Sequence, residues 1–276
     1  MDLLGVAAAL AAATIWALVI FLYKKHMEGL DAVVVNFSRL FYVAVFMWPV
    51  VFMARPSEGL IAAVASGLLT LVVGDSLYFY AIHKVGGSVA APLVYSYVVI
   101  AQYFAFVLGE AVSPFLILAS VLVVAGVSLL ARGGGPARVD VVGVFSALAA
   151  ALMWSLGMTA IKVASVGGVH PAVIAYTRVL SALVALGAYL YIRRRVGVVK
   201  SYVFAAASVL DLGVGSSLFA YAVEKAGLSL ATILVATSPL ITQLYARAAG
   251  LEKLTPLQAV GAVAIFAAVA VAVGLR

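Results

Sequence analysis

Ten apolar stretches of about 20 residues recur along this chain, separated by short segments that carry charges, glycine or proline. An α-helix rises about 1.5 Å per residue, so each stretch can cross a hydrocarbon core of roughly 30 Å. We therefore expect an all-α membrane protein with ten transmembrane helices, over residues 3–23, 31–53, 60–82, 88–107, 112–131, 141–162, 171–192, 202–223, 229–247 and 256–275. The short connections predict that consecutive helices are antiparallel.

The composition fits the bilayer and excludes several other classes of protein. Hydrophobic residues make up 66% of the chain and charged residues only 10%, whereas soluble domains carry about 25% charged residues. The net charge of +7 does not indicate nucleic-acid binding, because the basic residues lie mostly at the ends of apolar segments. The absence of cysteine excludes disulfides, thiolate nucleophiles and cysteine metal sites.

The two halves of the chain resemble each other. A glycine-rich stretch near the midpoint divides the chain into residues 1–132, a linker of residues 133–140, and residues 141–276. The segments 74–86 and 215–227 match in register at seven positions. Residues that recur in the same order are Gly5 and Gly143, Trp16 and Trp154, Lys24 and Lys162, Arg39 and Arg178, Gln102 and Gln243, Glu110 and Glu252, and Pro114 and Pro256. Chance similarity between Ala/Val-rich helices seldom preserves such a series, so the sequence predicts an internal repeat.

Five spans in each half are an odd number, so the second half must enter the membrane from the opposite side. The chain is therefore expected to form two inverted five-helix repeats. Inverted repeats are a recurring architecture of secondary transporters, in which the substrate binds near the middle of the membrane between the halves.

These duplicated residues resemble those of the drug/metabolite transporter superfamily, in particular proteins with two EamA-type domains. The resemblance covers essentially the whole chain, although residues 95–97 (Tyr-Ser-Tyr) depart from residues 236–239 (Ala-Thr-Ser-Pro) of the second half. It implies an alternating-access carrier in the cell membrane that exports or exchanges a small organic metabolite, such as an amino acid. The alternative is a lipid flippase or a structural membrane protein without solute transport.

The orientation is left open by two conflicting indications. Connections that follow odd-numbered spans hold most of the loop Lys and Arg residues, and the other face holds only Arg55, Lys162, Lys225 and Arg276. The positive-inside rule then places both termini outside the cell. The family resemblance implies termini in the cytoplasm instead.

Four charged residues fall inside predicted spans, where a charge costs at least about 2.5–3.5 kcal/mol on insertion scales: Arg39, Asp75, Arg178 and Asp211. By helical rise, Arg39, Asp75 and Asp211 lie at a similar depth below the face of the odd-numbered connections. Arg39 is expected to pair with one of these two acids, which leaves the other free to couple proton movement to transport. The alternative is a static ion pair that only joins helices.

Arg178 has no acid at its own depth, and Glu224 is its nearest candidate partner in the sequence. Its guanidinium could hold an anionic group such as a carboxylate or phosphate, or it could cap carbonyls at a helix end. Lys24 and Lys162 end their helices and are expected to extend to the membrane interface.

Aromatic and hydroxyl side chains inside the spans are candidates for a substrate cavity, with helix packing as the alternative use. Trp16 and Trp154 lie deep in their helices, and buried tyrosine hydroxyls need partners in lipid. Prolines at 92 and 239 are expected to bend spans four and nine. The candidate set is Trp16, Tyr78, Tyr80, Tyr95, Tyr97, Trp154, Tyr176, Arg178, Tyr221, Thr237 and Ser238, with Arg39, Asp75 and Asp211 as coupling or ion-pair residues.

Enzymatic and channel functions find little support. The three histidines lie in separate segments, and neither a His-Glu-x-x-His motif nor a Walker A motif occurs. A channel would need a continuous file of polar residues, and such residues are few here. We therefore expect no catalytic residues, metal or cofactor. The expected partners are a small-molecule substrate and the bilayer, and the chain is expected to be a monomer, with a dimer as the alternative.

Overall fold

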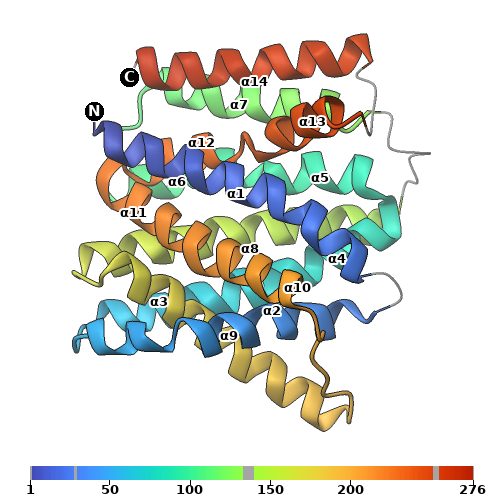
Figure 1. Cartoon of the computed structure of the whole chain (residues 1–276). Coiled ribbons are helices and arrows are strands. Elements are labelled where there is room, and N and C mark those ends of the chain that lie inside the picture. The colour runs from blue at the N-terminus through green and yellow to red at the C-terminus, as the bar shows by residue number, and fades with distance from the viewer. Residues whose placement is uncertain (1, 28–29, 133–139, 251–254, 276) are drawn as a thin grey trace.

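The computed structural model describes residues 2–27, 30–132, 140–250 and 255–275, and every regular element in these ranges is a helix (Figure 1). Eight helices are long and apolar enough to cross a membrane, and two shorter apolar helices, Ala32–Phe46 and Pro114–Leu130, accompany them. Residues 133–139 of the predicted linker (133–140) and Glu252 lie outside the described residues. The prediction of an all-α membrane protein is confirmed.

Five spans make up the first half, and two of them are composite. Its elements are α1 (Leu3–Met27), α2 (Ala32–Phe46), η1 (Trp48–Met53), α3 (Gly59–Gly67), η2 (Leu68–Gly74), α4 (Asp75–Val85), α5 (Gly87–Tyr95), α6 (Tyr97–Val107) and α7 (Pro114–Leu130). The second half repeats this order without a counterpart of η1: α8 (Val141–Val166), α9 (Pro171–Ile192), α10 (Tyr202–Ser208), η3 (Val209–Gly215), α11 (Ser216–Ala226), α12 (Leu228–Val235), α13 (Ser238–Ala248) and α14 (Pro256–Gly274).

Irregular segments recur at equivalent points of the two halves. Spans three and eight each contain seven residues of π-helix, η2 and η3, in which the wider turn interrupts the α-helical hydrogen bonds. Spans four and nine each break into two helices, at Ser96 and at residues 236–237. These duplicated irregularities extend the sequence repeat to the backbone.

Each composite segment still corresponds to one predicted span, since residues 59–85, 87–107, 202–226 and 228–248 are each long and apolar enough to cross a membrane. Pro92 lies inside α5, and span four breaks four residues later, at Ser96. Pro239, by contrast, is in the first turn of α13, where a missing N–H costs no hydrogen bond. Span two is shorter than expected, since α2 ends at Phe46 and Pro49 opens the 3-10 helix η1.

The first helix of each half packs mainly against the other half. α1 lies against α11, α12 and α13, and α8 lies against α3, α4 and α5. Gly5 and Gly143 allow close approaches between the halves, since a Cβ atom would lie 2.9 Å from the Ala226 nitrogen and 2.7 Å from Lys84 Cβ, respectively. The halves are thereby interlocked rather than placed side by side.

The helices run roughly across the view in Figure 1, and both termini lie at its left side. The odd-numbered spans end at the right and the even-numbered spans end at the left. We call these the odd face and the even face. The last helices of the two halves, α7 and α14, pack together at the top of the view.

Candidate functional site

A cavity of about 900 Å³ lies between the two halves, and residues from every span contribute to its wall. Its lining reaches Gly87 and Ser88 at the start of α5, Ala131 after α7, and Thr255 before α14. All four positions lie next to connections of the odd face. No described residue of the even-face connections lines the cavity, so it extends toward the odd face and is closed at the other.

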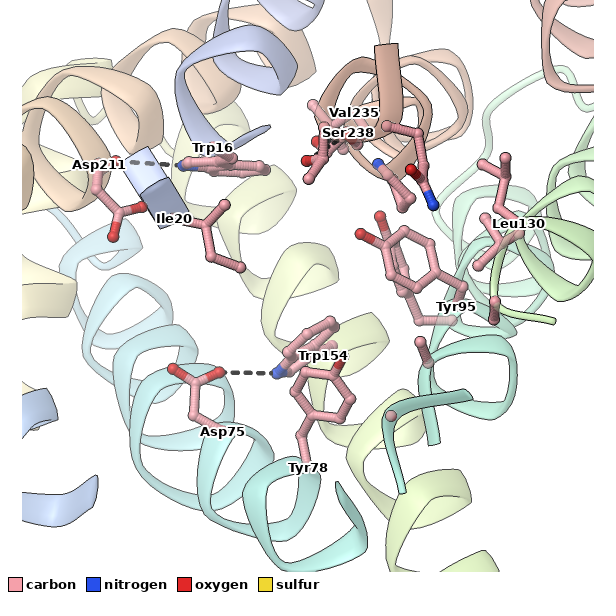
Figure 2. Close-up of a pocket in the computed structure, with 18 of the residues that line it drawn as sticks. Trp16, Ile20, Asp75, Tyr78, Tyr95, Leu130, Trp154, Asp211, Val235 and Ser238 are labelled. Atoms are coloured by element: carbon pink, nitrogen blue, oxygen red, sulfur yellow. Dashed lines mark hydrogen bonds between the residues drawn. The ribbon is translucent and has the colours of Figure 1, made fainter. Parts of the chain in front are cut away.

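The two repeat-related tryptophans form opposite walls of the cavity, each bonded to the other half (Figure 2). Trp16 Nε1 donates to the backbone carbonyl of Asp211 at 3.2 Å, and Trp154 Nε1 donates to Asp75 Oδ1 at 3.1 Å. The glycine that ends each π-segment makes room for the indole: a Cβ at Gly215 would be 2.7 Å from Trp16 Nε1, and one at Gly74 would be 2.7 Å from Trp154 Nε1. The indoles are therefore fixed in place by packing as well as by hydrogen bonds.

Arg39 forms a buried ion pair with Asp211. Its Nη2 lies 2.5 Å from Asp211 Oδ2, and the Tyr23 hydroxyl donates to the same oxygen at 2.9 Å. The guanidinium also lies over the Tyr23 ring, 5.2 Å from its centroid, and Nη1 donates to Asn36 Oδ1 at 3.4 Å. Asp211 is thus the acid that pairs with Arg39, and Asp75 is left with the Trp154 hydrogen bond as its side-chain contact in the described residues.

Arg178 is buried, with 6% of its surface exposed, and it lines the same cavity. Its Nη2 donates to Thr70 Oγ1 at 3.0 Å, while its Nε has no hydrogen-bond partner. The sequence suggested Glu224 as a partner, but Glu224 pairs with Lys225 at 2.6 Å. No carboxylate of the described residues forms an ion pair with Arg178.

Three tyrosines join Trp154 in an aromatic wall. The Trp154 ring centroid lies 5.4 Å from that of Tyr78 and 5.8 Å from that of Tyr97, and Tyr97 is 5.7 Å from Tyr95. Ser238 of α13 lines the cavity as well, and Figure 2 shows it across the space from Trp154. These five predicted residues thus share one cavity with Trp16 and the four charged residues.

Four predicted residues lie elsewhere. Tyr80 is exposed, with Lys84 Nζ 5.7 Å from its ring centroid, and the Lys225 amine similarly lies 5.6 Å from the Tyr221 ring. The Tyr176 hydroxyl donates to the Ala44 carbonyl at 3.1 Å, which joins α9 to α2. The Thr237 hydroxyl donates to the Leu234 carbonyl at 2.7 Å, within the break between α12 and α13.

The comparisons with known proteins agree with this architecture. The model of the EamA-like transporter family matches residues 3–132 and again residues 141–274. The chain belongs to the EamA-like transporter family. The resemblance to proteins with two EamA-type domains is therefore confirmed, as is the expectation that the protein is a membrane transporter rather than an enzyme.

This EamA-like transporter is also similar to two other proteins. A protein of Archaeoglobus fulgidus described as an uncharacterized transporter is 25% identical over 190 residues, which are 67% of each chain. A solved crystal structure of a protein is similar over 99% of both chains, with a TM-score of 0.80 and 19% identity. The second likeness concerns the fold alone.

Sequence reasoning missed several lining residues of this EamA-like transporter. Ile20 and Met158 are apolar and carry no signal that separates them from packing residues. Thr70 could have been found, because it precedes Asp211 by 141 residues, which is the offset that aligns segments 74–86 and 215–227. Gln243, the repeat counterpart of Gln102, also lines the cavity.

A polar cluster closes the even face of the transporter. Glu110, between α6 and α7, pairs through Oε1 with Lys162 of α8 at 2.9 Å. Its two carboxylate oxygens also accept the backbone N–H groups of Leu228 at 2.7 Å and Ser229 at 3.0 Å, at the start of α12. The Ser229 hydroxyl in turn bonds to Gln102. Lys162 therefore binds an acid of the other half instead of extending to the interface, whereas the Lys24 side chain lies outside the described residues.

Proposed function

We propose that this protein is an alternating-access secondary carrier of a small organic metabolite, such as an amino acid, and that proton movement is coupled to transport. The observation that carries the proposal is a cavity of about 900 Å³ between two interlocked halves that reaches one face and is closed at the other. Such a cavity is large enough for a metabolite, and inverted halves can exchange their open and closed ends.

The closed end is built from contacts between the halves, which suits a structure that must open there. Glu110 belongs to the first half, and its partners Lys162, Leu228 and Ser229 belong to the second. Rocking one half against the other would separate these polar groups and expose the cavity to the even face. The π-segments and helix breaks, which occur in both halves, are natural points for this bending.

Asp75 is the residue that we assign to proton coupling. Arg39 is already paired with Asp211, so this ion pair serves to hold α2 against η3. Asp75 faces the cavity, and its only side-chain bond in the described ranges is from the neutral Trp154. A carboxylate at this place can take up or release a proton without breaking an ion pair.

The transporting unit in this proposal is one chain, with repeats over residues 1–132 and 141–276, in the cell membrane. Its orientation follows from the positive-inside rule, with both termini outside. A tag at the C-terminus labelled from outside intact cells supports this orientation, and a tag that reacts only after permeabilisation contradicts it.

Counterflow in proteoliposomes tests the carrier. Vesicles loaded with an unlabelled metabolite should accumulate the same labelled metabolite, with saturation, and empty vesicles should not. Amino acids, organic acids, nucleosides and sugars form the panel. Transport of labelled phospholipid between leaflets with no solute counterflow would contradict the proposal and favour a lipid flippase.

A further inference from the structure

The two repeat-related arginines have unlike partners at equivalent places. Arg39 of α2 pairs with Asp211, the third residue of η3, and Arg178 of α9 bonds to Thr70, the third residue of η2. The repeat therefore preserves the contact between an arginine and a π-segment. It does not preserve the charge, because a carboxylate stands in one half where a neutral hydroxyl stands in the other.

Thr70 gives little compensation for the charge of Arg178. Its hydroxyl donates its own proton to the Ser66 carbonyl at 2.6 Å and accepts from Arg178 at 3.0 Å. The arginine is buried to more than nine-tenths, and its Nε is unpartnered, as is the Nε of Arg39, so the difference between the two arginines lies in the charge of the partner and not in this atom. An arginine cannot lose its proton in proteins, so the cation must be stabilised by another group.

Asp75 lines the same cavity but makes no direct ion pair with Arg178 in the described part of the chain, and its carboxylate accepts from Trp154 instead. It therefore acts on the guanidinium only from a distance. A direct counterion for Arg178 can come from the cavity itself. The cavity extends to the odd face, so a small anion from that side has access to the guanidinium.

We propose that Arg178 binds the anionic group of the transported solute, and that this group is a carboxylate on an organic body that rests against the aromatic wall. A guanidinium forms two parallel hydrogen bonds with a carboxylate, which suits a single buried arginine. A doubly charged phosphate would face Asp75 and Asp211, and among the described residues that line the cavity Arg178 is the cation not already in an ion pair. This inference rests on the proposed carrier function and specifies the chemistry of its substrate.

Binding of three matched probes tests the inference: phenylacetate, its neutral analogue phenylacetamide, and phenyl phosphate. Calorimetry on the purified full chain should detect phenylacetate and give at least about tenfold weaker binding for phenylacetamide, since hydrogen bonds to a charged partner are the stronger ones. Equal affinity for the acid and the amide would overturn the proposal. Tighter binding of phenyl phosphate would overturn the choice of a carboxylate.

The repeat itself supplies the decisive variant. Thr70→Asp gives Arg178 the counterion that Arg39 already has, and it should weaken phenylacetate binding by about 10- to 100-fold. Thr70→Asn has a similar size without the charge and should weaken binding much less. Equal effects of the two substitutions would contradict a charge-based site.

Arg178→Gln should abolish the preference of the protein for phenylacetate over phenylacetamide, and Arg178→Lys should keep part of it. If Arg178→Gln does not fold, the comparison of Thr70→Asp with Thr70→Asn still tests whether Arg178 binds an anion. Solute counterflow that is unchanged in Thr70→Asp would contradict this inference but leave the carrier intact. Carboxylate binding that depends on Arg178, in a protein without counterflow, would contradict the carrier and support the binding site.

Discussion

Glu110 and Lys162 form an ion pair at 2.9 Å across the two halves, and the same carboxylate accepts the first backbone N–H groups of α12. An acid at a helix N-terminus binds the positive end of the helix dipole as well as the amine. One side chain thus joins the loop before α7 to α8 and α12. This geometry makes Glu110 the central contact of the closed face.

Glu110→Gln should loosen the even face. Loss of the charge weakens three hydrogen bonds, and we expect a loss of about 1–3 kcal/mol of stability, together with faster opening to the even face. The chain contains no cysteine, so a single Ser238→Cys reporter in the cavity can be labelled without background. Its rate of reaction with an impermeant maleimide added from the even face should rise in the variant.

Lys225→Met is the matched control for this experiment. Lys225 pairs with Glu224 at 2.6 Å, but these two residues are neighbours on the same helix and both side chains are partly exposed. Removing Lys225 should change neither the labelling rate nor the melting temperature, because exposed pairs contribute little. An effect equal to that of Glu110→Gln would show that the labelling reports general destabilisation rather than opening.

The ion pair of Arg39 and Asp211 should behave as a coupled unit. Removal of either partner leaves a buried charge, so Arg39→Met and Asp211→Leu should each lower the free energy of unfolding by about 3–5 kcal/mol. The double variant should cost clearly less than the two losses added together. Thermal unfolding in a fixed detergent gives the four melting temperatures, and additive effects would argue against the pair.

In the absence of ligand, Arg178→Met should stabilise the protein, whereas Arg39→Met should destabilise it. Arg178 has no carboxylate partner in the described residues, so its replacement by an apolar side chain removes a buried charge without leaving another. We expect the ligand-free protein to melt at a higher temperature than the unmodified chain. A fall as large as that of Arg39→Met would mean that Arg178 is structurally compensated.

Arg39 and Arg178 show how far the sequence predicts the site: it identifies the charged residues but not all of their partners. Insertion costs singled out all four intramembrane charges, and helical depth placed Arg39 with the acids. Which of Asp75 and Asp211 pairs with Arg39 depends on the side-chain directions set by the π-segments. No periodic pattern in the sequence predicts a π-helix. The partner of Arg178 was missed because threonine is common in membrane helices, although the repeat offset points to Thr70.

The fold could be predicted from the sequence more fully than the cavity residues could, for a physical reason. Span length and the repeat are set by the bilayer thickness and by duplication, and both appear directly in the sequence. Which side chains face the cavity depends instead on packing between the halves. Tyr97 and Tyr80 illustrate this: both are tyrosines inside apolar spans, yet one lines the cavity and the other is exposed.

Asp75→Asn should separate proton coupling from solute exchange. An asparagine keeps an oxygen that can accept from Trp154, and the other half carries the neutral Ser216 at the equivalent position. Counterflow should therefore continue, while accumulation driven by a pH gradient across proteoliposomes should be lost. Accumulation that persists in Asp75→Asn would remove this residue from the coupling mechanism.

Gly74→Ala and Gly215→Ala should disturb the two walls of the cavity in parallel. In each case the new methyl group would overlap the indole that the glycine accommodates, with 2.7 Å to Nε1 of Trp154 or of Trp16. Because rigid cores respond to overpacking by displacement, we expect a loss of about 1–3 kcal/mol and a shift of the ring from its hydrogen bond. Tryptophan fluorescence and melting temperature report these two effects. Gly87→Ala is the control, because a Cβ there meets no atom within 4 Å, and a comparable change in that variant would rule out a specific contact between the glycines and the indoles.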